Sequence, residues 1–155
     1  EDFFRYAILY KKGGVYLDVD SGINKPIKKF IREDDVALVT DEIPHTYYVQ
    51  WGLAYAAGHP FLQRTLEMIL DNIKNNPYPH NVHKTTGPTV YTEAVKACLK
   101  EDPTIPHRFM GPHYDNNMQF KYKLGKFFLY SDNSEHWKRK QLTQNIIKPE
   151  NEDSI

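Results

Sequence analysis

The chain alternates segments that have a helical spacing of apolar residues with short apolar runs. Residues 2–12 predict a helix whose apolar face carries Phe4, Ile8 and Leu9. Gly13 and Gly14 follow it and end the helix, as glycines commonly do after a last turn. Two further helices are predicted, one starting at Pro60 and one near Pro88, because proline suits a first helical position. The apolar positions of these two helices are Leu62, Leu66, Ile69, Leu70 and Ile73, then Val90, Ala94, Val95, Cys98 and Leu99.

Short β-rich runs lie between these helices. Residues 15–17 and 36–40 predict buried strands, and residues 47–57 favour a strand at their start. Residues 107–119 predict an irregular loop, followed by a strand over 126–130 and a polar helix over 135–147. Strands that alternate with helices are typical of an α/β layer architecture.

Composition excludes some classes of protein. The 155 residues carry 20 Lys plus Arg and 20 Asp plus Glu, so no general field attracts nucleic acid or an acidic membrane. No apolar run approaches the roughly 20 residues of a membrane span. Cys98 is the only cysteine, which rules out an intrachain disulfide. The chain begins within a helical pattern and without Met, so we expect a preceding part of the protein to be missing.

The stretch "GGVYLDVDSG" at residues 13–22 places two acids where a strand ends. If extended geometry persists to Asp20, the side chains of Asp18 and Asp20 point the same way, beyond the carboxyl end of the strand. Open α/β sheets bind ligands at that edge. Two carboxylates held together need a cation, a proton or a strong donor between them, and their oxygens suit Mg²⁺ or Mn²⁺. Gly22 would let the exit loop approach a ligand.

The wider pattern "EDFFRYAILYKKGGVYLDVD" resembles the DXD-motif sugar-nucleotide glycosyltransferases of the Och1-like and capsular-polysaccharide type, which are similar to glycosyltransferase family 32. The segments "WGLAYAAGHPFLQRTLEMI" and "TTGPTVYTEAV" resemble that family's Gly-His-Pro and Thr-Gly-Pro segments, in the expected order. The resemblance covers residues 1–99 well and the rest weakly. It implies an α/β fold of the GT-A type that lacks its N-terminal, nucleotide-binding part.

The resemblance also implies roles for individual residues. Asp18 and Asp20 would be the DXD pair and the catalytic acids, with Asp20 holding Mn²⁺ (or Mg²⁺) and Asp18 contacting both the donor and the ion. Asp2 and Arg5 would face the donor, although Arg5 could instead pair only with acids on its own helix. Gly87 starts a helix whose N–H groups could meet the donor, while plain N-capping by Thr86 is the simpler reading.

One stretch departs from the family pattern. The family often ends in a His followed a few residues later by Ser-Trp, and here the matching stretch is "YSDNSEHWK". Trp137 matches, but His136 stands in place of the serine and the upstream position is not His. Asp132, Asn133 or His136 would then complete the metal site, which leaves its third ligand open.

The resemblance therefore predicts a retaining, metal-dependent transfer of a hexose-type sugar from a UDP- or GDP-linked donor to a glycan, lipid or protein acceptor. We expect residues 1–148 to form the catalytic domain and residues 149–155 to form a flexible tail. The expected compartment is the cytoplasm for a bacterial or viral protein and the Golgi lumen for a eukaryotic one. Nucleic acid is not an expected partner.

Two alternatives remain at this point. "VYLDVDSG" also resembles the first motif of haloacid-dehalogenase-like phosphohydrolases, with Asp18 as the nucleophile. The second alternative is a non-catalytic remnant of such an enzyme that still binds a sugar or a nucleotide. The seven histidines show no zinc-site spacing, and His59 is expected to cap the helix at Pro60.

Overall fold

The computed structural model describes residues 2–43 and 45–120. At its centre lies a four-stranded sheet in the order β1 (Gly14–Leu17), β4 (Gly52–Tyr55), β3 (Ala37–Thr40) and β5 (Arg108–Met110). Strands β1 and β3 each pair antiparallel with β4, and β5 pairs parallel with β3. Strands β1, β3 and β5 therefore run in one direction, and their carboxyl ends meet at one edge of the sheet.

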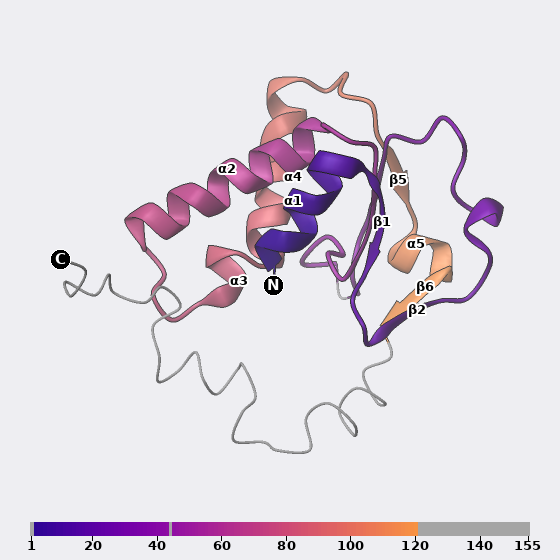
Figure 1. Ribbon diagram of the computed structural model, residues 1–155, viewed down its shortest axis with the longest axis horizontal. Helices are drawn as coiled ribbons and strands as arrows, with labels where there is room; N and C mark the ends of the chain where they lie inside the picture. The colour runs from indigo at the N-terminus through magenta and orange to yellow at the C-terminus, as the bar shows by residue number, and fades with distance from the viewer. Residues whose placement is uncertain (1, 44, 121–155) are drawn as a thin grey trace, which may run out of the picture.

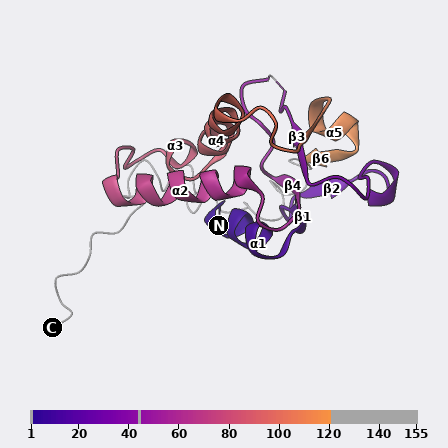
Figure 2. The ribbon, with the colours of Figure 1, turned by 90° about the horizontal axis from the view of Figure 1, so that it is seen from above.

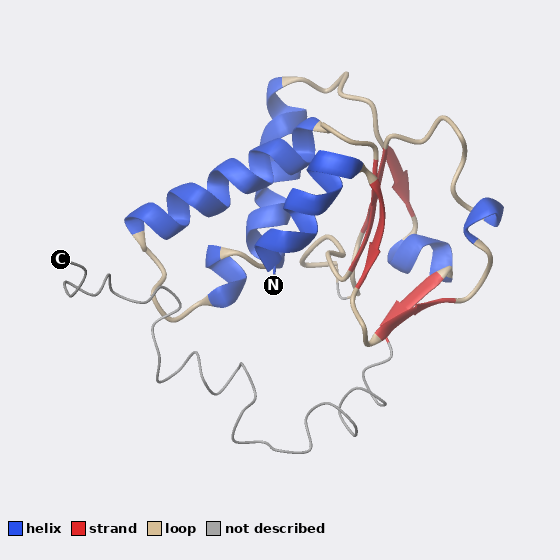
Figure 3. Cartoon of the chain, viewed as in Figure 1, coloured by secondary structure: helices blue, strands red, loops and turns tan. Residues whose placement is uncertain are grey.

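The two faces of the sheet are covered by different kinds of element (Figures 1 and 2). Helices α1 (Asp2–Lys12), α2 (Pro60–Asn75) and α4 (Pro88–Glu101) cover one face, with the short α3 (Val82–Thr85) beside them. The opposite side carries α5 (Pro112–Asn116) and a two-stranded sheet of β2 (Ser21–Ile23) and β6 (Met118–Phe120). The 3-10 helix η1 (Ile27–Lys29) lies beyond them, at the end of the molecule far from α2. Figure 3 shows that η1, α5, β2 and β6 are short compared with α1, α2 and α4.

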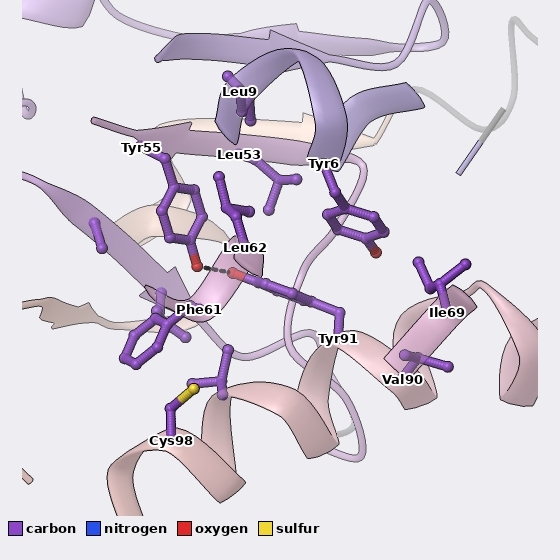
Figure 4. Packing of buried hydrophobic residues seen from close by; sticks show 13 residues of the cluster. Tyr6, Leu9, Leu53, Tyr55, Phe61, Leu62, Ile69, Val90, Tyr91 and Cys98 are labelled. Atoms are coloured by element: carbon purple, nitrogen blue, oxygen red, sulfur yellow. Dashed lines mark hydrogen bonds between the residues drawn. The ribbon is translucent and has the colours of Figure 1, made fainter. Parts of the chain in front are cut away.

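Alternation along the central strands divides the core into two clusters. In β4, Leu53 and Tyr55 belong to the cluster on the helix side, whereas Ala54 between them belongs to the cluster on the opposite side. Strand β3 alternates in the same way, which is why all its residues and all those of β4 are buried. In the helix-side cluster the hydroxyls of Tyr55 and Tyr91 share a hydrogen bond, and Tyr6 stacks on Tyr91 (Figure 4).

The predicted helices starting at residues 2, 60 and 88 are confirmed, and so are the strands at residues 15–17 and 36–40. His59 caps α2 as predicted, since its ring Nδ1 accepts from the Phe61 N–H at 3.1 Å. Cys98 is buried, also as predicted. The predicted apolar face of α1 is only partly confirmed, since Leu9 is buried and Ile8 packs against the same core. Phe4 is 61% exposed, because the face that packs on the sheet carries Arg5, Tyr6 and Leu9.

The predicted loop at residues 107–119 is wrong, since it contains β5, α5 and the start of β6. Gly22, expected in an exit loop, lies within β2 and is paired with Gln119 of β6. Both errors have one cause, because these three-residue strands are stabilised by partners far along the chain and leave no periodic pattern in the sequence. The strand predicted at 126–130, the helix at 135–147 and the boundary at residue 148 lie outside the described residues.

Candidate active site

The carboxyl edge of the central sheet gathers polar residues from three strands. Asp18 follows β1, Asp41 follows β3, and His113 comes soon after β5. The Asp18 N–H donates to the Trp51 carbonyl at 2.8 Å, which carries the β1–β4 pairing one residue past the strand. This is the edge at which α/β sheets commonly bind ligands.

Arg5 lies at the centre of a polar cluster on the helix side of this edge. Its Nη2 donates to Asp2 Oδ1 at 3.0 Å, and its Nη1 donates to the Gln50 carbonyl at 2.9 Å. The same Nη1 lies 3.3 Å from Asp18 Oδ1. The Tyr16 hydroxyl donates to Asp18 Oδ1 at 3.0 Å, and the guanidinium lies over the Tyr16 ring. Arg5 therefore pairs with an acid of its own helix and also with the DXD acid, and it is only 4% exposed.

Burial and charge act against each other in this cluster. Burial raises the pKa of the Asp18 carboxyl above its ordinary value, although Arg5 and Tyr16 act to lower it; Asp20 and Asp2 raise it further. Burial acts to lower the pKa of Arg5, but Asp18 and Asp2 outweigh that effect and the pKa is raised. The guanidinium is thus paired with two carboxylates, those of Asp2 and Asp18, and Asp20 adds a third negative charge nearby, so negative charge is in excess.

The acid pair lies on a tight turn, so the expectation of extended geometry through Asp20 is wrong. The Ser21 N–H donates to the Asp18 carbonyl at 3.0 Å, and the Ser21 hydroxyl donates to the same oxygen at 2.6 Å. The Asp18 carboxylate contacts Arg5 and Tyr16, while Asp20 has no hydrogen bond or ion pair to any residue in 2–43 or 45–120. Asp20 is therefore the acid that is available to a ligand.

A divalent cation fits the excess negative charge and the hard oxygen donors of this turn. Within the described part of the chain no group of three or more His, Cys, Asp or Glu side chains could hold a metal ion. The turn therefore offers at most Asp20 and Asp18, and a bound ion would need further oxygens from a ligand such as a diphosphate. Asp132, Asn133 and His136, predicted as additional ligands, lie outside the described residues.

The Thr-Gly-Pro segment meets the same cluster. The Thr86 hydroxyl donates to Asp2 Oδ2 at 3.0 Å, so Asp2 joins α1 to the start of α4. The predicted N-capping of α4 by Thr86 is wrong, because Gly87 is the N-cap residue and Thr86 ends α3. The Gly87 N–H donates to the Val82 carbonyl at 2.9 Å, and a Cβ on Gly87 would lie 2.8 Å from the His83 Cα. Close packing accounts for this glycine, and a donor contact at Gly87 stays a prediction.

Four residues at this edge were not singled out from the sequence as site residues. Tyr16 and Thr86 hold the carboxylates of Asp18 and Asp2, and the fold brings Asp41 and His113 to the same edge. The aromatic position before "LDVD" was a signal for Tyr16. His113 carried no signal, since its position depends on the pairing of β5 with β3. Gln50 and Trp51 contribute backbone carbonyls to Arg5 and Asp18.

The part of the chain that carries the acid pair of this site matches a known protein family. Residues 1–37, which hold α1, β1 and the acid pair, match the family described as "Glycosyltransferase sugar-binding region containing DXD motif". The predicted resemblance to DXD-motif glycosyltransferases is therefore confirmed.

Curated relatives agree with the family match. The chain is 31% identical over 122 residues to an initiation-specific alpha-1,6-mannosyltransferase of Schizosaccharomyces pombe (strain 972 / ATCC 24843), a match that covers 63% of this chain and 31% of the relative. It is 30% identical over 94 residues to inositol phosphoceramide mannosyltransferase 3 of the same organism, covering 56% of this chain and 24% of the relative. The chain thus spans less than a third of the length of these relatives.

A solved structure supports the fold. The PaToxG glycosyltransferase matches with a TM-score of 0.50 and 24% identity, over 66% of this chain and 34% of that structure. This likeness confirms the predicted α/β fold of the GT-A type. No helix in the described part of the chain is both long and apolar enough to cross a membrane.

Proposed function

We propose that this chain carries the donor-binding and catalytic part of a retaining, metal-dependent glycosyltransferase. The donor would be a UDP- or GDP-linked hexose and the acceptor a glycan, a lipid or a protein. Two relatives are named as mannosyltransferases, which makes mannose the first sugar to test.

One observation carries the proposal. The three segments that resemble the family lie apart in the sequence, yet two of them converge directly on one cluster. Asp2 pairs with Arg5 and accepts from Thr86, and Arg5 reaches Asp18 of the acid pair. The Gly-His-Pro segment supports them from α2, which packs with α1 and α4. A solvated acidic turn would need neither a buried arginine nor this convergence.

The residues of the site have different proposed roles. Asp20, which is free of partners among the described residues, would bind a divalent cation, and Asp18 would assist it. When bound, such an ion neutralises the diphosphate that leaves with the nucleotide. Arg5 and Tyr16 hold the Asp18 carboxylate in one orientation, so the site does not have to reorganise when the donor enters. The described residues 2–43 and 45–120 offer no clear nucleophile for a double displacement, so we propose attack on the same face of the sugar.

The test is donor hydrolysis and sugar transfer with GDP-mannose and a panel of UDP-hexoses, with and without Mn²⁺. Asp20→Asn should lower the metal-dependent rate by about 100-fold or more, because it removes a charged ligand of the ion. The melting temperature should stay nearly unchanged, since Asp20 has no partner among residues 2–43 and 45–120.

The matched control is Asp34→Asn, which removes the same charge from an exposed acid on the turn before β3. It should leave the rate unchanged. Full activity of Asp20→Asn would defeat the assignment. Nucleotide binding without turnover in the parent chain would favour the non-catalytic remnant, and a phosphorylated Asp18 would favour the phosphohydrolase.

A further inference from the structure

The surface that follows the acid pair is a basic loop, residues 24–29 with the sequence "NKPIKK". All six residues are exposed, and three of them are lysines. None of Lys25, Lys28 and Lys29 forms an ion pair with a described residue. The loop therefore presents three uncompensated positive charges within five positions, although the chain as a whole is neutral.

The backbone of this loop is fixed at both ends. Asn24 donates from its N–H to the Asn117 carbonyl and from its side chain to the Asn116 carbonyl, each at 2.8 Å. At the other end Phe30 is buried in the core opposite the helices, and its carbonyl accepts from Arg108 Nη2 at 2.8 Å. A charged run that is merely solvated does not need such anchoring.

An apolar side chain lies among the lysines. Ile27 is 39% exposed and begins η1, directly after Pro26. Beside it an open hollow of about 440 Å³ is lined by residues 23–27. Figures 1 and 2 place η1 at the end of the molecule far from α2, where a flat surface can reach it. Lysines around an exposed aliphatic residue are typical of contacts with the interface of an anionic membrane.

We propose that the basic loop is a docking surface for an anionic lipid membrane, with Lys25, Lys28 and Lys29 over the headgroups and Ile27 inserted between them. A nucleic acid is disfavoured, because the exposed apolar residue is aliphatic and offers no ring for base stacking. The exposed acids Glu33 and Asp34 follow on the next turn and limit the attraction to short range. The contact is weak and reversible, and it orients the protein.

The position of the loop links this surface to the proposed reaction. Lys25 is five residues after Asp20, so the two Cα atoms are at most about 18 Å apart. Docking would hold the acid pair near the membrane, where an acceptor fixed to the lipid surface is within reach. That consequence rests on the proposed function, whereas docking itself does not.

Docking is tested without any activity measurement, by co-sedimentation with phosphatidylcholine vesicles that contain about one third phosphatidylserine. Replacing all three lysines with Gln should weaken binding by roughly fivefold per lysine, on the order of 100-fold together. Binding of the parent chain should fall as salt is added. Ile27→Ser should weaken binding at unchanged charge.

The matched control replaces Lys11, Lys12 and Lys74 with Gln, which changes the charge equally at exposed positions on the helix side. It should bind like the parent. Equal losses in the two triple variants would overturn the proposal, and so would equal binding to pure phosphatidylcholine. Complete displacement from vesicles by millimolar inorganic phosphate would indicate a site for free anions, and preferential binding to RNA would indicate a nucleic-acid surface; either would replace the membrane.

Discussion

The two faces of the central sheet are stabilised in different ways. On the helix side, α1, α2 and α4 bury a continuous set of apolar and aromatic side chains. On the opposite side, η1, α5, β2 and β6 are each five residues or fewer, and many of their contacts are hydrogen bonds. The helix side is thus built mainly from the apolar area of three long helices, whereas the opposite side combines a smaller apolar cluster with specific polar contacts made across long stretches of chain.

The turn in α5 shows what those polar contacts support. His113, Tyr114, Asp115 and Asn116 all have φ between 54° and 60°, the left-handed region that L-residues avoid. The Thr40 hydroxyl donates to the Gly111 carbonyl and accepts from the Tyr114 N–H. The Tyr114 hydroxyl donates to the Gly52 carbonyl at 2.6 Å. Strained backbone of this kind persists only where its surroundings fix it.

The largest effect is expected from removing apolar volume on the helix side. Leu62 is fully buried against the other residues of that core, so Leu62→Ala should lower the free energy of unfolding by about 3 kcal/mol. Chemical denaturation measures this. A loss under 1 kcal/mol would mean that apolar packing does not dominate this face.

The next effect compares one substitution on both faces. Thr40→Val keeps the shape of the side chain but leaves the Tyr114 N–H and the Gly111 carbonyl without their hydroxyl partner. This should lower the free energy of unfolding by about 2 kcal/mol. Thr65→Val on α2 is the control, because among the described residues the Thr65 hydroxyl bonds only to the Phe61 carbonyl of its own helix. The control substitution should lower the free energy of unfolding by well below 1 kcal/mol. Equal losses in the two variants would remove the distinction between the faces.

A third effect depends on pH and lies on the helix side. Burial lowers the pKa of His59 below its ordinary value near 6.5, and the neutral ring caps α2 through Nδ1. The unfolded chain therefore binds a proton first as the pH falls, so stability is full above about pH 6.5 and decreases below it. Loss of the cap is worth about 1 kcal/mol.

His59→Asn keeps a capping side chain but cannot titrate in this range. Thermal melts of the parent and the variant between pH 8 and pH 5 should diverge only at the acidic end. Parallel curves would show that His59 does not contribute to the acid sensitivity.

The smallest effect has opposite signs on the two faces. Asn116→Gly should stabilise the protein by on the order of 0.5 kcal/mol, because glycine adopts a positive φ without a steric penalty. Asn75→Gly in the last turn of α2 should destabilise it by a similar amount, since that backbone is helical. Two shifts of the same sign in differential scanning calorimetry would contradict the left-handed assignment of α5.

The same division explains how far the sequence could be read. Helices α2 and α4 were predictable, because their prolines and apolar spacing are local signals. Strands β2 and β6 could not be predicted, because Ser21 pairs with Phe120, which lies at the far end of the described sequence. For α1 the position and the burial of Leu9 were predictable, but the burial of Arg5 was not, because it depends on partners at Asp18 and Gln50.

The candidate site follows the same rule. Asp18, Asp20, Asp2 and Arg5 could be chosen from residue type and from resemblance to a family. Their geometry could not, since the two Ser21 hydrogen bonds that close the turn and the Thr86 contact to Asp2 appear only in three dimensions. The roles proposed for these residues in binding an ion and a donor stay predictions.

Gly13 lies where α1 ends and the chain passes to β1, with φ at +68°. A Cβ there would stand 2.7 Å from the Ala57 backbone nitrogen, which belongs to the segment that leaves β4. The methyl group of an alanine at position 13 would therefore clash with this backbone and push α1 away from the sheet. Arg5, eight positions earlier, would move with it, so Gly13 helps to set the distance between the guanidinium and the Asp18 carboxylate.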